Sequence, residues 1–416
     1  MTVQAAERAG GGETGFLRAT LSCWALFLGF AFMVVGHGLL GSLLGNRLTL
    51  EGHPTGTSGL VMSGFFVGIV TAGLLAPRLI GRVGHIRVFA AMGGLCSSMA
   101  LLHSLWVEPW FWFLLRTITG FAATTMYIVV ESWVNDRAQN AFRGRLLSVY
   151  MLVWLSCMAG GMFLIDLADP LSNLLFIVVA ICYGLSIAPL ALATGAAPEY
   201  SAPERVSIRT LWRASPLGTV AAGMVGLIHG TLVGMVAVYV TSAGNSQGRV
   251  AVLTGAIFLG GLVLQMPIGR LSDRHDRRLV LAGVSLLAAA FAVAALLLSK
   301  ISFCAEVGAI AVFGGLCLPM YALTLSVAND RLSQRAMVGA SATLYLLLGI
   351  GATVGPPVAG FLMQGFGAAG FYLYLAVLQV VLALFALWRR RRRAAPPQTA
   401  SALPAAPVAP PPSQMT

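Results

Sequence analysis

Apolar stretches of about 20 residues, the length of one bilayer crossing, alternate along the chain with short polar segments that are rich in arginine. No stretch of about ten residues alternates apolar and polar side chains strictly enough for an outer-membrane barrel strand. The pattern therefore predicts membrane-spanning helices. The twelve expected spans are 20–44, 58–77, 88–105, 110–134, 146–165, 171–194, 216–241, 250–268, 279–299, 304–328, 336–363 and 367–388.

Composition strengthens this prediction. Of the 416 residues, 58% are hydrophobic and 10% are charged, whereas soluble globular domains contain about 25% charged residues. The twelve spans occupy most of the chain, so no sizeable soluble domain fits beside them. The predicted fold class is an all-α integral membrane protein.

The net charge of +12 would suggest nucleic-acid binding in a soluble protein, but here the positions of the basic residues explain it. If both termini lie in the cytoplasm, 22 of the 26 Lys and Arg residues fall on the cytoplasmic side, as the positive-inside rule requires. The exceptions are Arg47, Arg116, Arg249 and Lys300. We therefore expect both termini in the cytoplasm and no nucleic-acid partner.

The two halves of the chain repeat several landmarks at nearly constant spacing, which predicts two six-helix bundles in parallel repeat with a substrate pathway between them. The matching positions are His37 with His229 and Leu79 with Leu271, each 192 residues apart, and Tyr127 with Tyr321, 194 residues apart. We expect a cytoplasmic N-terminal segment (1–19), an N-terminal bundle (20–194), a cytoplasmic linker (195–215), a C-terminal bundle (216–388) and a basic, then Pro/Ala-rich disordered tail (389–416).

Several motifs resemble those of the major facilitator superfamily. Gly269–Arg278 (Gly-Arg-Leu-Ser-Asp-Arg-His-Asp-Arg-Arg) is similar to its loop motif, Arg116-x-x-x-Gly120 resembles a second motif, and Gly351–Gly360 resembles a glycine-proline element. Tyr127–Arg137 (Tyr-Ile-Val-Val-Glu-Ser-Trp-Val-Asn-Asp-Arg) is similar to the YcaD-like branch. The resemblance implies a transporter with spans 1 and 7 lining a central cavity, and Gly355, Pro356 and Pro319 are the expected hinge or packing residues.

The loop motif points to an ionic gate on the cytoplasmic side. Asp273 is the favoured gate residue, because an anion where helix ends meet can pair with nearby arginines. The first-half loop has Gly81 in place of this aspartate, so any such latch should be asymmetric. The other candidate members of the gate are Arg274, Arg277, Arg278, Asp330 and Arg331, for which a purely topological role is the alternative.

Span 4 has one small or polar face that contains Arg116, Gly120, Tyr127 and Glu131. An arginine inside a span must face protein or water, so Arg116 is a candidate for the cavity, with binding to backbone carbonyls of a neighbouring helix as the alternative. Glu131 is the candidate for proton coupling, and a structural ion pair is the alternative.

His37 and His229 occupy equivalent positions in spans 1 and 7, so we expect them at similar depth on opposite walls of the cavity. Either can bind cargo or titrate near neutral pH; a hydrogen-bonded packing role is the alternative. Tyr127 and Tyr321 form a second equivalent pair, and Pro319 is expected to loosen span 10 beside it.

The chain contains no GxxxxGK[ST], HExxH or GxSxG motif and no paired Cys/His spacing, so we expect no enzyme activity, no cofactor and no metal site. We predict a secondary active transporter in the inner membrane that moves a small solute by alternating access, coupled to protons. Organic anions, polar metabolites and amphipathic compounds remain open as cargo. The expected partners are the solute, a proton and the bilayer, and the expected state is a monomer. The alternative is a non-transporting scaffold, assembly factor or sensor.

Overall fold

The computed structural model describes residues 23–137, 143–192, 206–244, 246–332 and 334–392. The predicted segment 1–19, the first half of the linker and nearly all of the tail lie outside the described residues. In chain order the elements are α2 (Trp24–Leu50), α3 (Thr55–Val83), α4 (His85–Leu105), α5 (Pro109–Arg137), α6 (Arg143–Phe163), η1 (Leu164–Leu167), α7 (Leu174–Ala191), α8 (Ile208–Ala214), α9 (Pro216–Ser242), α10 (Gln247–Arg274), α11 (Arg277–Leu298), α12 (Phe303–Cys317), α13 (Met320–Asn329), α14 (Gln334–Phe366) and α15 (Ala369–Arg392).

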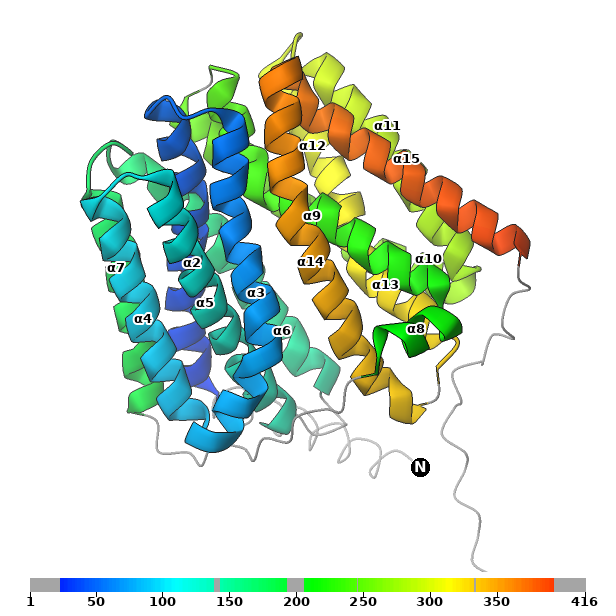
Figure 1. Ribbon diagram of the computed structural model, residues 1–416, viewed down its shortest axis with the longest axis horizontal. Coiled ribbons are helices and arrows are strands. Elements are labelled where there is room, and N and C mark those ends of the chain that lie inside the picture. The colour runs from blue at the N-terminus through cyan, green and yellow to red at the C-terminus, as the bar shows by residue number, and fades with distance from the viewer. Residues whose placement is uncertain (1–22, 138–142, 193–205, 245, 333, 393–416) are drawn as a thin grey trace, which may run out of the picture.

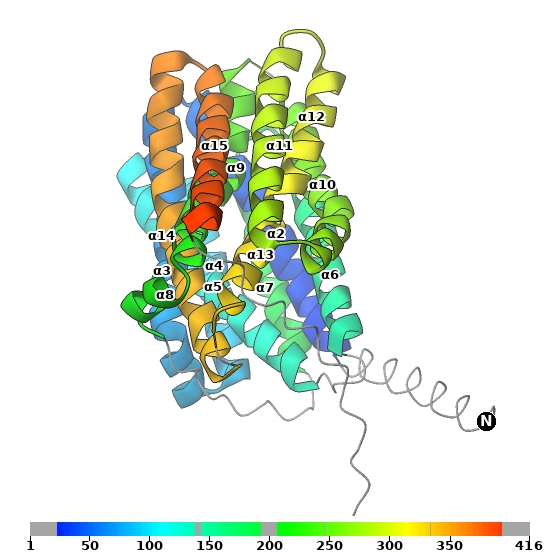
Figure 2. The same cartoon turned by 90° about the vertical axis from the view of Figure 1, so that its right-hand side faces the viewer.

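Within the described ranges the chain forms twelve spans long and apolar enough to cross a membrane, which confirms the predicted all-α membrane fold. Figure 2 shows the spans running along a common direction. The tenth span is divided into α12 and α13 at Leu318 and Pro319. Proline has no backbone N–H to continue the helical ladder, which explains a break at this position.

The spans form two groups, each with its own apolar core. One core is built mainly from α2–α7, with Ala251 and Phe258 of α10 and Ala352 of α14 packed into it, and the other is built from α9–α15. Figure 1 shows these groups as separate bundles, approaching each other at the end away from α8 and splaying apart toward the end where α8 lies. With twelve alternating spans, the start of α2 and the end of α15 belong to the α8 end.

Glycines allow the closest helix approaches, and the two halves use them in equivalent helix pairs. Within each half, a glycine lets the first span approach the fifth and another lets the second approach the fourth, where an added Cβ would meet the partner's backbone. The pairs are Gly161 with Val35, Gly120 with Phe65, Gly226 with Leu348 and Gly315 with Gly260. This shared packing is the structural counterpart of the sequence repeat.

The halves contact each other at the end away from α8. Thr241 donates a hydrogen bond to the side-chain oxygen of Asn46 (3.0 Å), and the Thr55 hydroxyl donates to the Gly360 carbonyl (2.9 Å). One turn along α3 and α14 from the Thr55–Gly360 bond, Gly59 on α3 lies directly against the Pro356 carbonyl on α14. We refer to this region as the closed end.

Candidate functional site

A small cavity lies between the two halves, below the closed end. Its walls come from α2, α3, α5 and α6 of the first half and from α9 and α10 of the second. The lining residues are His37, Gly41, Ser42, Met62, Phe65, Phe66, Arg116, Met158, Met162, Val233, Gly234, Val236, Ala237 and Thr254. Of the five residues that we expected in a central cavity, this lining contains His37 and Arg116.

Arg116 extends from α5 into this cavity and is only 3% exposed. Its guanidinium carbon lies 4.7 Å from the centre of the Phe65 ring, a cation–π contact. The Nε and Nη1 atoms are buried without a hydrogen-bond partner. The backbone-carbonyl contacts that a packing role for Arg116 would require are therefore not formed at these two atoms.

His37 lies beside Arg116 in the same cavity. Its Nδ1 is 3.4 Å from the Tyr183 hydroxyl on α7, and its ring is 4.8 Å from Phe65 and 6.2 Å, edge-on, from Tyr127. Tyr127 thus contacts His37 without being part of the cavity lining.

His229 has a different environment from its sequence partner. Its Nε2 lies 2.8 Å from the carbonyl oxygen of Cys317, the last residue of α12. Since the helix is broken just after Cys317, this carbonyl is available to a side chain. The cavity lining includes His37 but not His229, so the two histidines do not share one pocket.

Glu131 lies nearer the α8 end, where the halves separate. Its side chain is exposed, and Tyr150 on α6 donates a hydrogen bond of 2.9 Å to its Oε1. Tyr321 and Tyr345 of the second half form an edge-on pair at 6.0 Å and are close enough to interact electrostatically with Glu131. The carboxylate therefore faces aromatic residues of both halves, and its proton-coupling role stays a prediction.

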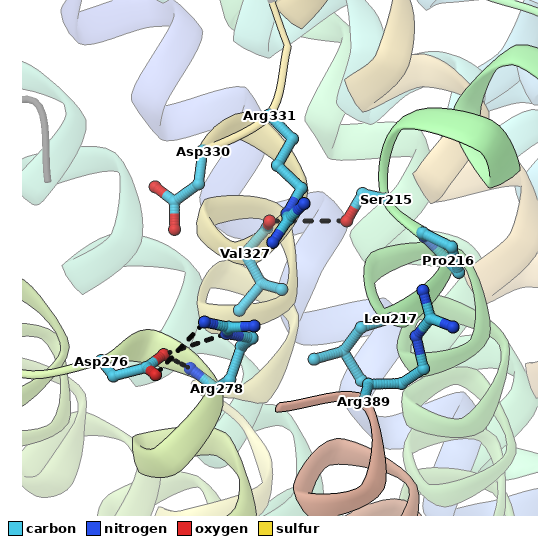
Figure 3. A pocket seen from close by; sticks show the side chains of 9 residues that line it. All are labelled: Ser215, Pro216, Leu217, Asp276, Arg278, Val327, Asp330, Arg331 and Arg389. Carbon is cyan, nitrogen blue, oxygen red and sulfur yellow. Dashed lines mark hydrogen bonds and ion pairs between the residues drawn. The ribbon is translucent and has the colours of Figure 1, made fainter. Parts of the chain in front are cut away.

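Three of the candidate gate residues, Arg278, Asp330 and Arg331, line one pocket in the second half (Figure 3). Arg277 forms an ion pair with Asp330 and lies 3.8 Å from Asp273, whose side chain is 75% exposed. Arg278 forms an ion pair with Asp276 at 3.2 Å. Arg278, Arg331 and Ser215 line this pocket, in which Figure 3 shows Arg331 extending toward Ser215. Asp330 is thus a tighter partner of Arg277 than the favoured Asp273.

Asp276 was not predicted as a member of this network. Its side chain caps the start of α11, accepting from the Arg278 N–H at 3.0 Å, and it also lies 3.5 Å from Arg390. Burial acts to raise the pKa of Asp276, but Arg278 and Arg390 outweigh it and hold the pKa below its usual value. Burial raises the pKa of Asp330, although Arg277 acts to lower it.

The network joins α11 to α13 and α15 within one half. The ion pairs Arg277–Asp330, Arg278–Asp276 and Arg390–Asp276 all lie within the second half. The exposed Arg274 forms none of these pairs. A gate function for these charges stays a prediction.

The predicted hinge residues on α14 lie at helix contacts. Gly355 faces the carbonyl of Leu227 on α9, and Pro356 presents its carbonyl to Gly59 of the other half. Pro319 lies at the break between α12 and α13. In the part of the chain that is described, no three His, Cys, Asp or Glu side chains are grouped as metal ligands would be.

A further polar cluster escaped the sequence analysis. Glu306, at the start of α12, is 3% exposed and accepts hydrogen bonds at Oε1 from the hydroxyls of Tyr239 (2.5 Å) and Tyr372 (2.9 Å). These three residues lie at the end of the second half away from α8, beside a pocket that Arg249 and Lys300 also line. In the sequence, this cluster is indicated only by a single glutamate within an apolar span.

Comparisons with known proteins relate both halves of the chain to transporters. The family model described as Major Facilitator Superfamily matches residues 218–413, and that of Sugar (and other) transporter matches 42–164. The MFS-type transporter YcaD of Escherichia fergusonii is 25% identical over 359 residues, covering 86% of this chain and 92% of the relative. YfkF of Bacillus subtilis, also an MFS-type transporter, is 26% identical over 350 residues, covering 82% and 88%. The chain therefore resembles the major facilitator superfamily in both halves.

Solved structures agree with this fold. A bacterial homologue of the human lysosomal transporter Spinster, in an inward-facing and occupied conformation, aligns with a TM-score of 0.74 at 15% identity, covering 90% of this chain and 97% of that one. The nucleoside transporter NupG aligns with a TM-score of 0.69 at 14% identity, covering 88% and 98%. From these matches, this chain is a multi-pass membrane transporter, resembles the YcaD-like branch and, like the transporters it matches, is not an enzyme.

Proposed function

We propose that this transporter moves a small solute across the cytoplasmic membrane by alternating access, driven by the proton gradient. The bundles 20–194 and 216–388 are the units that rock, and the chain works as a monomer with both termini in the cytoplasm. No nucleic acid takes part.

One observation carries the alternating-access proposal: a cavity built by both halves lies between the hydrogen-bonded closed end and side-chain contacts nearer α8, such as that of Trp154 with Phe258 (5.7 Å between ring centres). The contacts at the closed end are two hydrogen bonds between uncharged groups and the approach of Gly59 to Pro356. Figure 1 shows the bundles splaying apart toward the other end. Glu131 of the first half is exposed, and Tyr345 of the second half, which is 41% exposed, interacts with it electrostatically. A solute entering from the α8 end reaches the cavity, and separation of the closed end releases it.

Glu131 is the proposed proton carrier. Its carboxylate is exposed on the open side and hydrogen-bonded to Tyr150, so it can exchange protons with the aqueous opening. Glu131 lies on the same helix as Arg116, α5, and is 15 residues or about 22 Å further along its axis toward the α8 end. Rocking of the halves changes which side of the membrane reaches this carboxylate.

The test is internal pH in proteoliposomes of purified protein, screened against pooled metabolites and amphipathic compounds. We expect solute-dependent proton movement that is lost in Glu131→Gln and retained in Glu108→Gln, a control in the loop before α5. His37→Ala, His229→Ala and Arg116→Ala test the binding residues in the same assay. Solute flux that persists with no proton movement would refute coupling while leaving transport intact, and the absence of movement of any labelled solute would refute transport.

A further inference from the structure

The buried guanidinium of Arg116 lacks the partners that a membrane-embedded cation requires. Arg116 lies seven residues into α5, about 10 Å along the helix axis from its start, and its Nε and Nη1 atoms are buried without hydrogen bonds. An unpaired charge at such a position is destabilising by several kcal/mol unless an anion or water compensates it.

The surroundings of Arg116 supply no anion. Its cavity neighbours are the imidazole of His37 and the face of Phe65, and Tyr183 lies behind His37. Among the described residues, no carboxylate lies in the cavity lining or pairs with Arg116. Compensation must therefore come from water or from a molecule that enters the cavity, and an anion compensates the charge directly.

The lining also limits the kind of molecule. Ser42 donates its hydroxyl to the backbone carbonyls of Gly38 and Leu39, and Thr254 donates to Val250, so neither has a free donor for a sugar-like hydroxyl group. The rest of the wall is mainly methionine, phenylalanine, valine and alanine. Arg116 is the only cation in this lining, which matches one negative charge rather than two.

We propose that the substrate is an organic monoanion with an apolar body, a hydrophobic carboxylate, and that Arg116 binds its carboxylate group. This inference rests on the proposed transport function and names the substrate class of the same cavity. The planar guanidinium can hold a carboxylate through two parallel hydrogen bonds, using the buried N–H groups that have no partner in the protein. His37 lies beside this group, and Phe65, Phe66 and the methionines contact the apolar body.

Binding is tested by thermal shift of the purified protein in detergent at fixed ionic strength. The probes are benzoate and octanoate, their uncharged amides benzamide and octanamide, and the dianion terephthalate. We expect the two monocarboxylates to stabilise the wild type, and the amides and the dianion to bind about tenfold more weakly or worse, because each lacks the single matched charge. Equal shifts from acids and amides, or no shift from either acid, would overturn the proposal.

Variants separate a binding role from a structural one. Arg116→Met keeps length and removes the charge, so we expect the ligand-free protein to be as stable as the wild type or more so, with the response to benzoate lost. Arg116→Lys should restore part of that response, and Arg270→Met, an exposed arginine on α10, should change neither property. Ligand-free Arg116→Met that is less stable than wild type, or fails to fold, would show a structural role and refute the inference.

This test is independent of transport itself. If monocarboxylates fail to bind while labelled solutes of another class move in proteoliposomes, the substrate assignment fails and the transport proposal stands. If monocarboxylates bind but no solute moves, the transport proposal fails and the binding site remains.

Discussion

The contribution of a hydrogen bond to stability inside the membrane bundle can be measured, against a matched control, in the cluster formed by Glu306, Tyr239 and Tyr372. Tyr239 and Tyr372 both donate to Oε1 of a carboxylate that is 3% exposed. Tyr372→Phe removes one hydroxyl and keeps the ring, so the change isolates the hydrogen bond. The stacked and edge-on ring contacts with Phe371 and Tyr239 should persist.

The expected loss follows from the acceptor and its burial. Hydrogen bonds to charged groups contribute about 1.5–3 kcal/mol in soluble proteins, and side-chain hydrogen bonds within membranes average about 0.6 and reach about 1.7 kcal/mol. Because the carboxylate is so little exposed, we expect Tyr372→Phe to lower the free energy of unfolding by about 1.5 kcal/mol, roughly a tenfold change in the unfolding equilibrium constant. The double variant with Tyr239→Phe should lose more than the sum of the single variants, because the carboxylate then has no hydroxyl donor.

The assay is the free energy of unfolding in mixed micelles, obtained by titration with a denaturing detergent. Tyr374→Phe is the control, since this half-buried tyrosine lies two residues further along α15 and should change stability by less than about 0.5 kcal/mol. If Tyr372→Phe behaves like the control, or if the two losses simply add at a few tenths of a kcal/mol, the cluster does not depend on these hydroxyls.

Three further predictions concern the helix contacts. Gly59→Ala should hinder approach to Pro356 and increase labelling of a cysteine placed at the closed end, whereas Gly73→Ala, with open space on the same helix, should not. Asp276→Asn should lower the free energy of unfolding by about 1 kcal/mol at pH 7. Because the folded-state pKa of Asp276 is depressed, this difference from the wild type should persist down to about pH 5 and fade only below about pH 4. Unfolding measured as a function of pH tests this. His229→Leu should destabilise by roughly 0.6–1.7 kcal/mol through loss of the bond to Cys317, and His229→Gln by less; equal losses would exclude that bond as the cause.

The sequence was informative wherever a local pattern decides the structure. Apolar length alone located all twelve spans, because crossing a bilayer requires a long run of apolar residues. The largest differences are at the ends. For example, α10 continues to Arg274, six residues beyond the expected span, because a helix can extend past the hydrocarbon core where charged side chains meet water.

Contacts between distant spans required the structure. Glu306 meets residues 67 and 66 positions away on two other helices, and nothing in the local pattern specifies that meeting. The histidine pair shows a second limit: the repeat predicts equivalent backbone positions for His37 and His229, but the surrounding side chains differ between the halves. Tyr183 is beside His37, whereas the helix break after Cys317 provides a partner for His229.

The closed end has a consequence for how transport should respond to its surroundings. Its contacts include uncharged hydrogen bonds and close apolar packing, such as Gly45 against Ala237 and Gly56 against Phe361, beside the carboxylate of Asp166, which lies next to Gly248 of α10. Ionic strength has little effect on these uncharged contacts, since salt screens only charges. Parting these surfaces exposes apolar groups to water and raises the heat capacity, so the opening equilibrium should vary with temperature along a curve rather than a straight van't Hoff line.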